Sequence, residues 1–198
     1  MCDCDIHKLL AEREAVIIRD YDAALDLAGF SLEDTVLDIA TGSGRMLLQL
    51  VRRGHSVVSG DIDGDALERA RERLGGLADK PTLVILNAHS MAFKNDMFGA
   101  ATLANAIHEM ENPRGALDEI ARVLTDEGKL LVVEFNSLGF ELMELHHKTQ
   151  GRGQHPRGEM STEDIDRYLR SSFSLVETQE FSIVHAWVAS GRKRGGSR

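Results

Sequence analysis

The sequence predicts a single α/β domain: a sheet of about seven strands, mostly parallel with an antiparallel hairpin at its C-terminal edge, and helices on both faces. Three observations carry this prediction. Short apolar runs alternate with stretches of helical periodicity along most of the chain. The run at 129–135 is almost wholly apolar, which is typical of a central strand covered on both faces. The first apolar run, 36–39, leads directly into a glycine turn at 42–44 and then into a helical pattern.

Length, composition and charge limit the functions that the chain can have. Its 198 residues supply one well-buried core, so we expect one domain over 1–198. The net charge of −9 argues against nucleic acid as a principal partner, because phosphate binding depends on clustered Lys and Arg. No apolar run approaches the roughly 20 residues that span a bilayer, and the acidic N-terminus lacks the pattern of a signal peptide. We therefore expect a cytoplasmic protein without a membrane span, and the oligomeric state, including a homodimer, stays open.

The two cysteines lie close to the N-terminus, at Cys2 and Cys4. Their near adjacency disfavours a disulfide between them. With His7 they form Cys-x-Cys-x-x-His, a pattern that can supply soft ligands to a metal. The sequence offers no fourth ligand, and terminal segments are usually mobile, so we expect a frayed end without a metal.

Helical spacing dominates the start of the chain. Apolar side chains recur at intervals of four at Ile17, Tyr21 and Leu25, which places them on one side of a helix. We interpret 1–30 as a helical lid before the first strand. The elements expected in this half are a helix over about 8–28, strands at 36–39 and 57–61, a helix through 47–51 closed by Gly54, a helix capped by Asp63 and ended by Gly75 and Gly76, and a strand at 82–86.

Capping residues mark the helices of the second half. Asn112 and Pro113 are favoured as the N-cap and first residue of a helix, and Ser161 with Asp164 resembles a capping box. The elements expected in this half are a strand at 100–104, a helix with Leu117, Ile120, Ala121 and Leu124 inward, a strand at 129–135, a short helix at 140–147, a loop at 151–158, a helix with Ile165, Tyr168 and Leu169 inward, paired antiparallel strands at 175–181 and 183–189, and a disordered tail at 192–198.

The glycine turn and Asp61 together predict a nucleoside ligand. In an open α/β sheet the ligand binds at the carboxyl ends of the strands, where the first turn forms the floor of the crevice. Gly42 and Gly44 bring backbone amides close to a ligand, and Asp61, about twenty residues later at a strand end, can accept hydrogen bonds from ribose hydroxyls. An NAD-dependent oxidoreductase would carry a third small residue where this chain has Leu47, so Leu47 counts against NAD.

Most of the chain resembles the class I S-adenosylmethionine-dependent methyltransferases. The segment 36–46 resembles their first motif, in the variant found in quinone-biosynthesis C-methyltransferases. The segments 57–63 and 87–93 resemble the second and third motifs, 116–134 the later helix and strand with their Glu-Ile-Ala-Arg-Val-Leu signature, and 181–193 the closing hairpin. The resemblance implies a Rossmann-like fold, S-adenosylmethionine as cofactor and methyl transfer to a small-molecule acceptor by in-line displacement. The alternative is a non-catalytic module that keeps the fold and binds the cofactor or a partner protein.

The resemblance also implies roles for individual residues. Gly42 and Gly44 would lie against the methionine portion, Asp38 would hold its amino group through water, and Asp61 would bind the ribose. Ile62 would contact the adenine ring, although ordinary packing is an equal alternative for Ile62 and Ala88. The cofactor-binding residues expected on this basis are Tyr21, Asp38, Ala40, Gly42, Ser43, Gly44, Asp61, Ile62, Asn87, Ala88 and Asn105.

The acceptor does not follow from the resemblance. The segment 105–109 matches neither the Asn-Pro-Pro-aromatic box of adenine and amide methylation nor the Gly-Leu-Arg-Asn pattern of the quinone enzymes. His108 and Glu109 are the candidate catalytic residues, because they follow a strand end on the ligand side of the sheet. A neutral imidazole can take a proton from a hydroxyl or an acidic carbon. The alternative is that His108 orders its loop or faces solvent.

The polar segment 137–160 is interpreted as a cap over the acceptor. It contains His146, His147 and His155, and a metal site there is conceivable. Adjacent histidines on a helix point in different directions, so we expect no metal at this cap.

Overall fold

A computed structural model describes residues 3–193, and within them the chain forms a seven-stranded sheet in the order β3-β2-β1-β4-β5-β7-β6. The strands from β3 to β5 are parallel, and β7 pairs antiparallel with β5 and with β6. This confirms the predicted fold class. In chain order the elements are α1 (Asp3–Ala28), β1 (Thr35–Ile39), α2 (Arg45–Arg52), β2 (Ser56–Asp61), α3 (Gly64–Leu74), the short 3-10 helix η1 (Gly75–Leu77), β3 (Thr82–Ile85), β4 (Phe98–Ala104), the 3-10 helix η2 (Ile107–Glu109), α4 (Pro113–Val123), β5 (Leu124–Phe135), α5 (Ser137–Thr149), α6 (Thr162–Ser172), β6 (Phe173–Glu180) and β7 (Val184–Arg192).

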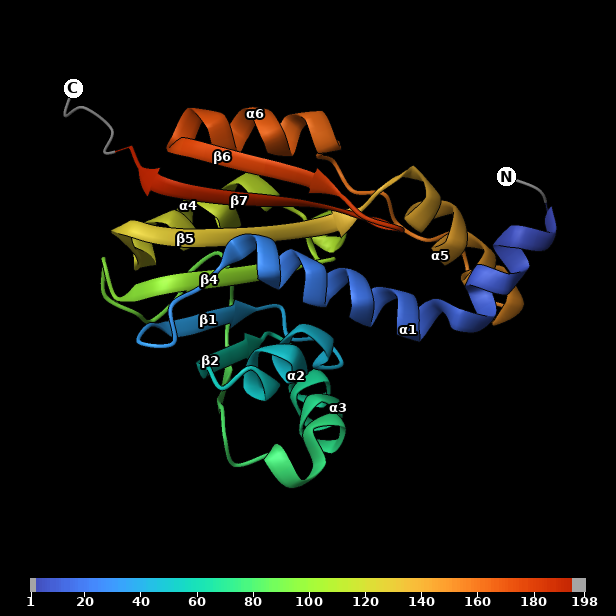
Figure 1. The fold of residues 1–198 in the computed structure, drawn as a ribbon, viewed down its shortest axis with the longest axis horizontal. Helices are drawn as coiled ribbons and strands as arrows, with labels where there is room; N and C mark the ends of the chain where they lie inside the picture. The colour runs from blue at the N-terminus through green and yellow to red at the C-terminus, as the bar shows by residue number, and fades with distance from the viewer. Residues whose placement is uncertain (1–2, 194–198) are drawn as a thin grey trace.

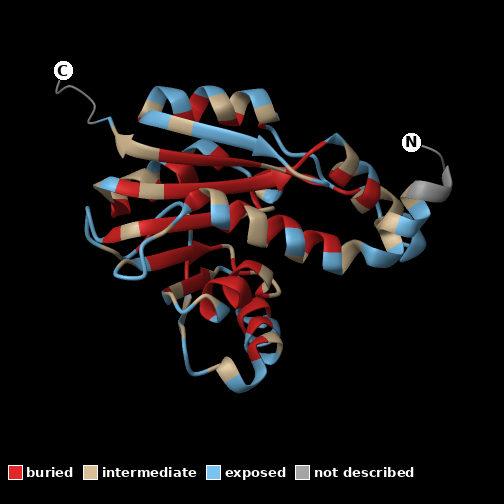
Figure 2. Ribbon diagram, viewed as in Figure 1, coloured by how far each residue is buried: buried red, intermediate tan, exposed pale blue. Residues whose placement is uncertain are grey.

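Helices cover both faces of the sheet (Figure 1). The alternation of side chains along β5 shows which face each helix covers. Leu131 and Val133 pack in one core cluster with α1, α2, α3 and α5. Leu130 and Val132 pack in a second cluster with α4 and α6. The buried residues accordingly concentrate in the central strands (Figure 2). The predicted apolar run at 129–135 is therefore a central strand buried on both sides.

Local capping chemistry sets the predicted starts of three helices. The Asp63 side chain accepts a hydrogen bond from the Asp65 amide at the start of α3, and Asn112 accepts one from the Gly115 amide at the start of α4. Ser161 and Asp164 form the predicted capping box at α6, each side chain bonding the other residue's backbone amide. These contacts lie within four residues of the chain, which explains why the sequence alone reveals them.

Three boundaries differ from the prediction. Leu124, expected on the helix, begins β5 because it pairs with Phe98 of β4, and Ala121 is only half buried. The helix expected at 140–147 is longer, since Asn136 caps α5 by accepting from the Gly139 amide. The tail expected from Arg192 begins later, because Arg192 completes β7 and donates hydrogen bonds to Asp126 and to the Ala121 carbonyl. Residues 194–198 of that tail lie outside the described residues.

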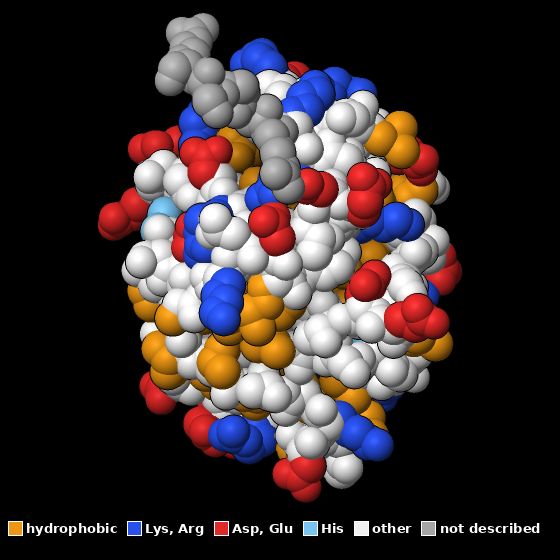
Figure 3. Space-filling view, turned by 90° about the vertical axis from the view of Figure 1, so that its left-hand side faces the viewer, with side chains coloured by type: hydrophobic (Ala, Val, Ile, Leu, Met, Phe, Trp, Pro, Cys, Tyr) orange, Lys and Arg blue, Asp and Glu red, His pale blue; other side chains and the backbone are white. Residues whose placement is uncertain are grey.

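The two ends of the parallel strands have different surfaces. Figure 3 shows the side where these strands begin, and there acidic, basic and apolar side chains are interspersed. The candidate site lies at the opposite end, where the strands finish. Among residues 3–193, no helix is both long and apolar enough to cross a bilayer. Cys2 lies outside the described residues, and with it the predicted Cys-x-Cys-x-x-His pattern.

Candidate functional site

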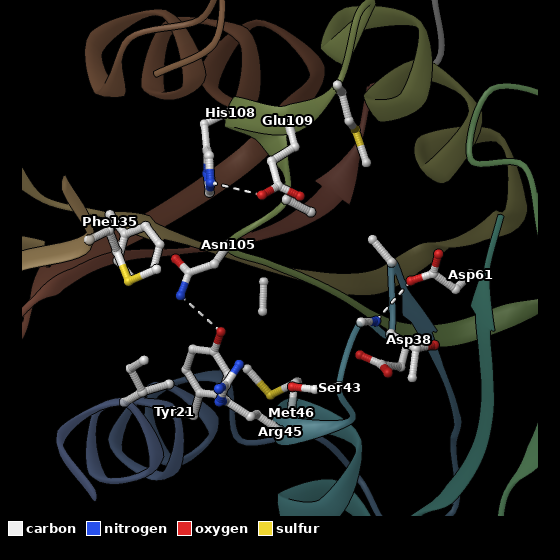
Figure 4. A pocket seen from close by; sticks show the side chains of 18 of the residues that line it. Tyr21, Asp38, Ser43, Arg45, Met46, Asp61, Asn105, His108, Glu109 and Phe135 are labelled. Atoms are coloured by element: carbon white, nitrogen blue, oxygen red, sulfur yellow. Dashed lines mark hydrogen bonds and ion pairs between the residues drawn. The ribbon is translucent and has the colours of Figure 1, made fainter. Parts of the chain in front are cut away.

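A cavity of about 400 Å³ opens at the carboxyl ends of β1 and β4, where the strand order reverses (Figure 4). Its size and place are those of a small-molecule site in an open α/β sheet. The β1–α2 turn forms its floor, α1 forms one wall, and η2 with α5 and the following loop forms the other. The lining residues are Arg13, Ile17, Tyr21, Asp38, Ala40, Thr41, Gly42, Ser43, Arg45, Met46, Asp61, Ile62, Ala104, Asn105, Ala106, His108, Glu109, Met110, Phe135, Met143 and His155.

Strand register creates the polar centre of the floor. Asp38 pairs with Ser59 on β2 and with Thr102 on β4, so the three side chains stand side by side on the α1 face of the sheet. Ser59 and Thr102 donate hydrogen bonds of 2.6 and 2.8 Å to the two Asp38 oxygens. Burial raises the pKa of Asp38 to about 6, and the two hydrogen bonds only partly oppose this.

The turn after β1 is held to β2 by two hydrogen bonds. The Thr41 amide donates to the Gly60 carbonyl, and the Gly42 amide donates to Asp61 Oδ2 at 2.8 Å. Gly42 has φ +54°, and a Cβ built on it would meet only the Ala40 carbonyl oxygen, at 3.9 Å, so a ligand can approach its backbone closely. Gly44 serves packing instead: a Cβ there would lie 2.9 Å from Ala70 of α3.

The α1 wall presents a stripe of side chains one turn apart. Arg13, Ile17 and Tyr21 follow the i, i+4 spacing and all line the cavity. Tyr21 is buried, which raises the pKa of its hydroxyl, and that hydroxyl accepts a hydrogen bond of 2.9 Å from Asn105 Nδ2. Asn105 has φ +48°, unusual for a residue other than glycine, and its Oδ1 is buried with no hydrogen-bond partner among residues 3–193. A donor from a ligand would satisfy that oxygen.

The opposite wall contains a buried imidazole and carboxylate pair. His108 Nδ1 lies 2.7 Å from Glu134 Oε1, and both side chains are almost fully buried. Glu134 also accepts from the backbone amides of His108 and Phe135, so three donors fix its position. His108 Nε2 is 3.8 Å from Glu109 Oε1. A carboxylate that accepts a hydrogen bond from Nδ1–H keeps the proton of the neutral ring on Nδ1 and fixes the orientation of the ring. Nε2 is then unprotonated, which is the arrangement of a general base.

The loop after α5 closes over this wall. His155 is 7% exposed, and its ring centre lies 4.9 Å from that of His108. Phe135 and Phe140 pack around the two imidazoles, and His155 Nδ1 lies 3.2 Å from His147 Nε2. Among the side chains of residues 6–193, no group of three or more has the arrangement of a metal site.

The cavity contains most of the predicted site residues. Tyr21, Asp38, Ala40, Gly42, Ser43, Asp61, Ile62, Asn105, His108 and Glu109 line it, whereas Gly44, Asn87 and Ala88 do not. Asn87 Oδ1 is engaged by the His89 amide in its own loop. Sequence reasoning missed Arg13, although its spacing from Ile17 and Tyr21 signals it, and missed Glu134, for which the sequence carries no local signal.

Comparisons with known proteins agree with this geometry. Residues 37–132 match the family model described as a methyltransferase domain. The chain is 32% identical to the ubiquinone/menaquinone biosynthesis C-methyltransferase UbiE of Ectopseudomonas mendocina over 164 residues, which cover 79% of this chain. It spans 64% of that relative's length. These matches show that the chain resembles the class I S-adenosylmethionine-dependent methyltransferases.

Solved structures show the same methyltransferase fold. A protein from Bacillus halodurans C-125 superposes with a TM-score of 0.63 at 25% identity, over 82% of this chain and 71% of its own. An S-adenosylmethionine-dependent methyltransferase from Methanosarcina mazei superposes with a TM-score of 0.63 at 21% identity, over 89% and 96% of the two chains. The second match, at its low identity, supports the fold alone.

The residues of the cavity fit S-adenosylmethionine, the cofactor of the methyltransferases that the chain resembles. The open backbone at Gly42 leaves room for the methionine portion, and the unpartnered Asn105 Oδ1 can accept from its amino group. Each carboxylate oxygen of Asp61 accepts one backbone hydrogen bond, from the Gly42 amide and from the Asp63 amide. The remaining lone pairs can accept hydrogen bonds from ribose hydroxyls. Ile62 is 70% exposed beside it, as an apolar surface for a base. The buried Leu47 stands where a dinucleotide fold needs a small residue.

Proposed function

We propose that the protein transfers the methyl group of S-adenosylmethionine to a small-molecule acceptor that loses a proton, from a hydroxyl or an acidic carbon. One observation carries the proposal: the cofactor residues Gly42 and Asp61 share a single cavity with an imidazole, His108, oriented by a buried carboxylate. The relative named above, a quinone-pathway C-methyltransferase, supports a small-molecule acceptor. We place the reaction in the cytoplasm. In this proposal the methyl acceptor is neither a nucleic acid nor a component of a membrane.

The chain's own groups have four tasks in this reaction. When bound, the cofactor supplies an electrophilic methyl group together with its leaving group. The turn at 40–44 and Asp61 hold the cofactor in place. Tyr21, Phe135 and the cap exclude water from the cavity. His108 Nε2 receives the acceptor proton, and Glu134 stabilises the imidazolium that results. Glu109, exposed at the rim, orients the acceptor.

We also propose that α1 and the segment 137–160 act as lid and cap. Both line the cavity, through Tyr21 on α1 and through Met143 and His155 in the cap. A cavity of about 400 Å³ leaves little space beside a bound cofactor, so the acceptor enters by displacement of one of these segments.

The test has two stages. Calorimetric titration should show binding of S-adenosylmethionine and none of NAD. A labelled-methyl transfer screen over quinols, phenols, amines and thiols should then give product with the quinols or phenols, and His108→Asn should lower that rate about 10²-fold or more. Tight cofactor binding without transfer to any class would favour a non-catalytic module instead.

A further inference from the structure

Three histidines from three parts of the chain form a connected row at the acceptor side of the cavity. His108 comes from η2, His147 from α5 and His155 from the loop that follows α5. The ring centres are 4.9 Å apart for His108 and His155 and 4.6 Å apart for His155 and His147. His155 is buried although the residues on either side of it are exposed. The loop therefore inserts this one side chain into the wall of the cavity.

The hydrogen bonds determine where the protons of this row lie. His147 Nδ1 lies 3.2 Å from the Gly153 carbonyl, which can only accept, so Nδ1 carries the proton and Nε2 of the neutral ring does not. His147 Nε2 in turn faces His155 Nδ1 at 3.2 Å, so His155 Nδ1 donates. His155 Nε2 is left as an unprotonated acceptor.

The two rings at the cavity therefore share one tautomer. His108 Nδ1 donates to Glu134, which leaves its Nε2 unprotonated as well. Burial, followed by the neighbouring His108, His147 and Arg157, lowers the pKa of His155 to about 4 against the opposing effect of Glu144. With both rings neutral, the acceptor side of the cavity thus carries two imidazole nitrogens that accept hydrogen bonds and donate none.

His155 Nε2 has no hydrogen-bond partner in the described part of the chain. A buried acceptor without a donor is unfavourable, and a ligand that brings a donor removes the penalty. The loop is held in this position by other contacts: the His155 amide donates to Glu144 Oε2 at 3.0 Å, and Gly158 lies directly against the His108 backbone. The imidazole is therefore kept in place although its Nε2 has no partner among the described residues.

We infer that His155 is a second contact for the methyl acceptor, which presents two hydrogen-bond donors, one to His108 Nε2 and the other to His155 Nε2. The inference rests on the proposed function and adds the class of acceptor. Phe135 and Met143 line the same space, so the body between the donors is apolar and flat. A ring that carries two neighbouring hydroxyl groups meets all three requirements. One hydroxyl gives its proton to His108, and the other holds the ring through His155.

The tautomers are tested by nuclear magnetic resonance of protein labelled with ¹⁵N-histidine and saturated with S-adenosylhomocysteine. We expect protonated Nδ1 and unprotonated Nε2 at His108, His147 and His155. In His147→Gln, whose side-chain amide can donate to His155 Nδ1, the proton of His155 should shift to Nε2 while His108 keeps its tautomer. A proton on Nε2 of His155 in the unmodified protein would overturn the inference.

Ligand binding is tested with catechol and phenol, titrated in the presence of S-adenosylhomocysteine. The unmodified protein should bind catechol about five- to tenfold more tightly than phenol, as expected for one additional hydrogen bond. His155→Leu should remove this preference, and His155→Gln, whose amide oxygen still accepts, should keep part of it. His146→Gln, one position from His147 on the same helix, is the matched control and should keep all of it.

The readouts separate this inference from the proposed function. An undiminished catechol preference in His155→Leu, or no preference in the unmodified protein, contradicts the role of His155 while cofactor binding stays intact. If the unmodified protein does not bind S-adenosylhomocysteine, that result contradicts the proposed function itself. In every histidine variant that supports the inference, the Kd for S-adenosylhomocysteine should stay within about twofold of the unmodified value.

Discussion

The two aspartates of the cavity floor have different surroundings and, we argue, different roles. Asp38 is 2% exposed, and side-chain hydroxyls already occupy both of its oxygens. Asp61 is half buried and accepts two backbone amides, one from the turn and one from the start of α3. Asp61 therefore both shapes the turn and presents free lone pairs to a ligand, whereas Asp38 supports the floor from below.

Replacing Asp61 by Ala should weaken cofactor binding by about 1–3 kcal/mol, because it removes a charged hydrogen-bond acceptor. Titration calorimetry with S-adenosylhomocysteine measures the change. Asp65→Ala is the control, since Asp65 lies exposed in the first turn of α3 and does not line the cavity. Unchanged affinity in Asp61→Ala would remove the main support for the nucleoside end of the site.

Replacing Asp38 by Asn should change how stability depends on pH. The carboxyl has a pKa of about 6 in the folded protein, against an ordinary value of 3.8 for aspartate. The folded protein thus binds this proton more tightly than the unfolded chain does. The stability that the bound proton contributes is present below about pH 4 and is lost as pH rises through about 6. Asp38→Asn carries no charge to bury, so near pH 8 it should exceed the unmodified protein in unfolding free energy by about 1–3 kcal/mol.

The difference in unfolding free energy between Asp38→Asn and the unmodified protein should shrink as pH falls to about 4. Urea denaturation at several pH values measures this difference. Asp65→Asn, the same change at an exposed carboxyl that does not line the cavity, is the control. A pH-independent difference for Asp38→Asn would show that the carboxyl keeps its ordinary pKa.

At the scale of elements, the cap depends on one close contact with η2. Gly158 has φ +70°, and a Cβ built on it would lie 2.6 Å from His108 Cα. Only glycine allows the loop to approach the backbone that carries His108. The same loop holds Gly153, around which a Cβ would meet no atom within 4 Å.

Gly158→Ala should therefore displace the cap, whereas Gly153→Ala should not. The clash and the left-handed backbone act together at Gly158, so we expect faster proteolysis between 150 and 160 and at least tenfold slower methyl transfer. Cofactor affinity should change little, because the turn at 40–44 does not contact this loop. Limited proteolysis and transfer rates of both variants measure the effect, and equal behaviour of the two glycine variants would contradict it.

The elements that sequence reasoning located are those fixed by nearby residues. Asp63, Asn112 and the Ser161 capping box act over a few positions, and the turn after β1 lies within one motif. Pairing across the sheet has no such local sign. Leu124 begins a strand only because Phe98 lies beside it. Arg192 continues β7 only because Asp126 and the Ala121 carbonyl accept hydrogen bonds from its guanidinium.

The same distinction holds for the site. Asp38, Gly42 and Asp61 follow from motif spacing, and the structure brings them to one cavity. Glu134 lies 26 positions from His108 and meets it only through the parallel pairing of β4 with β5. The loop that carries His155 has no periodic pattern, so its approach to His108 cannot be deduced from the sequence.

At the scale of the whole molecule, α1 is tied down at one end and reaches the site at the other. Near its C-terminal end, buried Asp20 accepts from the Ile183 amide at 2.8 Å, and Lys129 donates to the Ala28 carbonyl. Towards its N-terminal end, Glu14 bridges Arg45 at 2.8 Å and Arg73 at 2.7 Å. The predicted lid therefore cannot swing as one rigid helix, and any movement belongs to its N-terminal half.

Hydrogen exchange with and without S-adenosylhomocysteine tests this division. The buried Asp20 contact joins α1 to the start of β7 and should keep 16–28 protected in both states, while 5–15 should gain protection only with ligand. Glu14→Gln should weaken ligand binding about two- to fivefold and reduce that gain, because it loosens Arg45 at the cavity and Arg73, which donates to the Ser43 carbonyl. Glu12→Gln, exposed on the same helix, should leave both measurements unchanged. Equal gains of protection along all of α1 would instead require the whole helix to open, with its buried Asp20 contact broken each time a ligand enters.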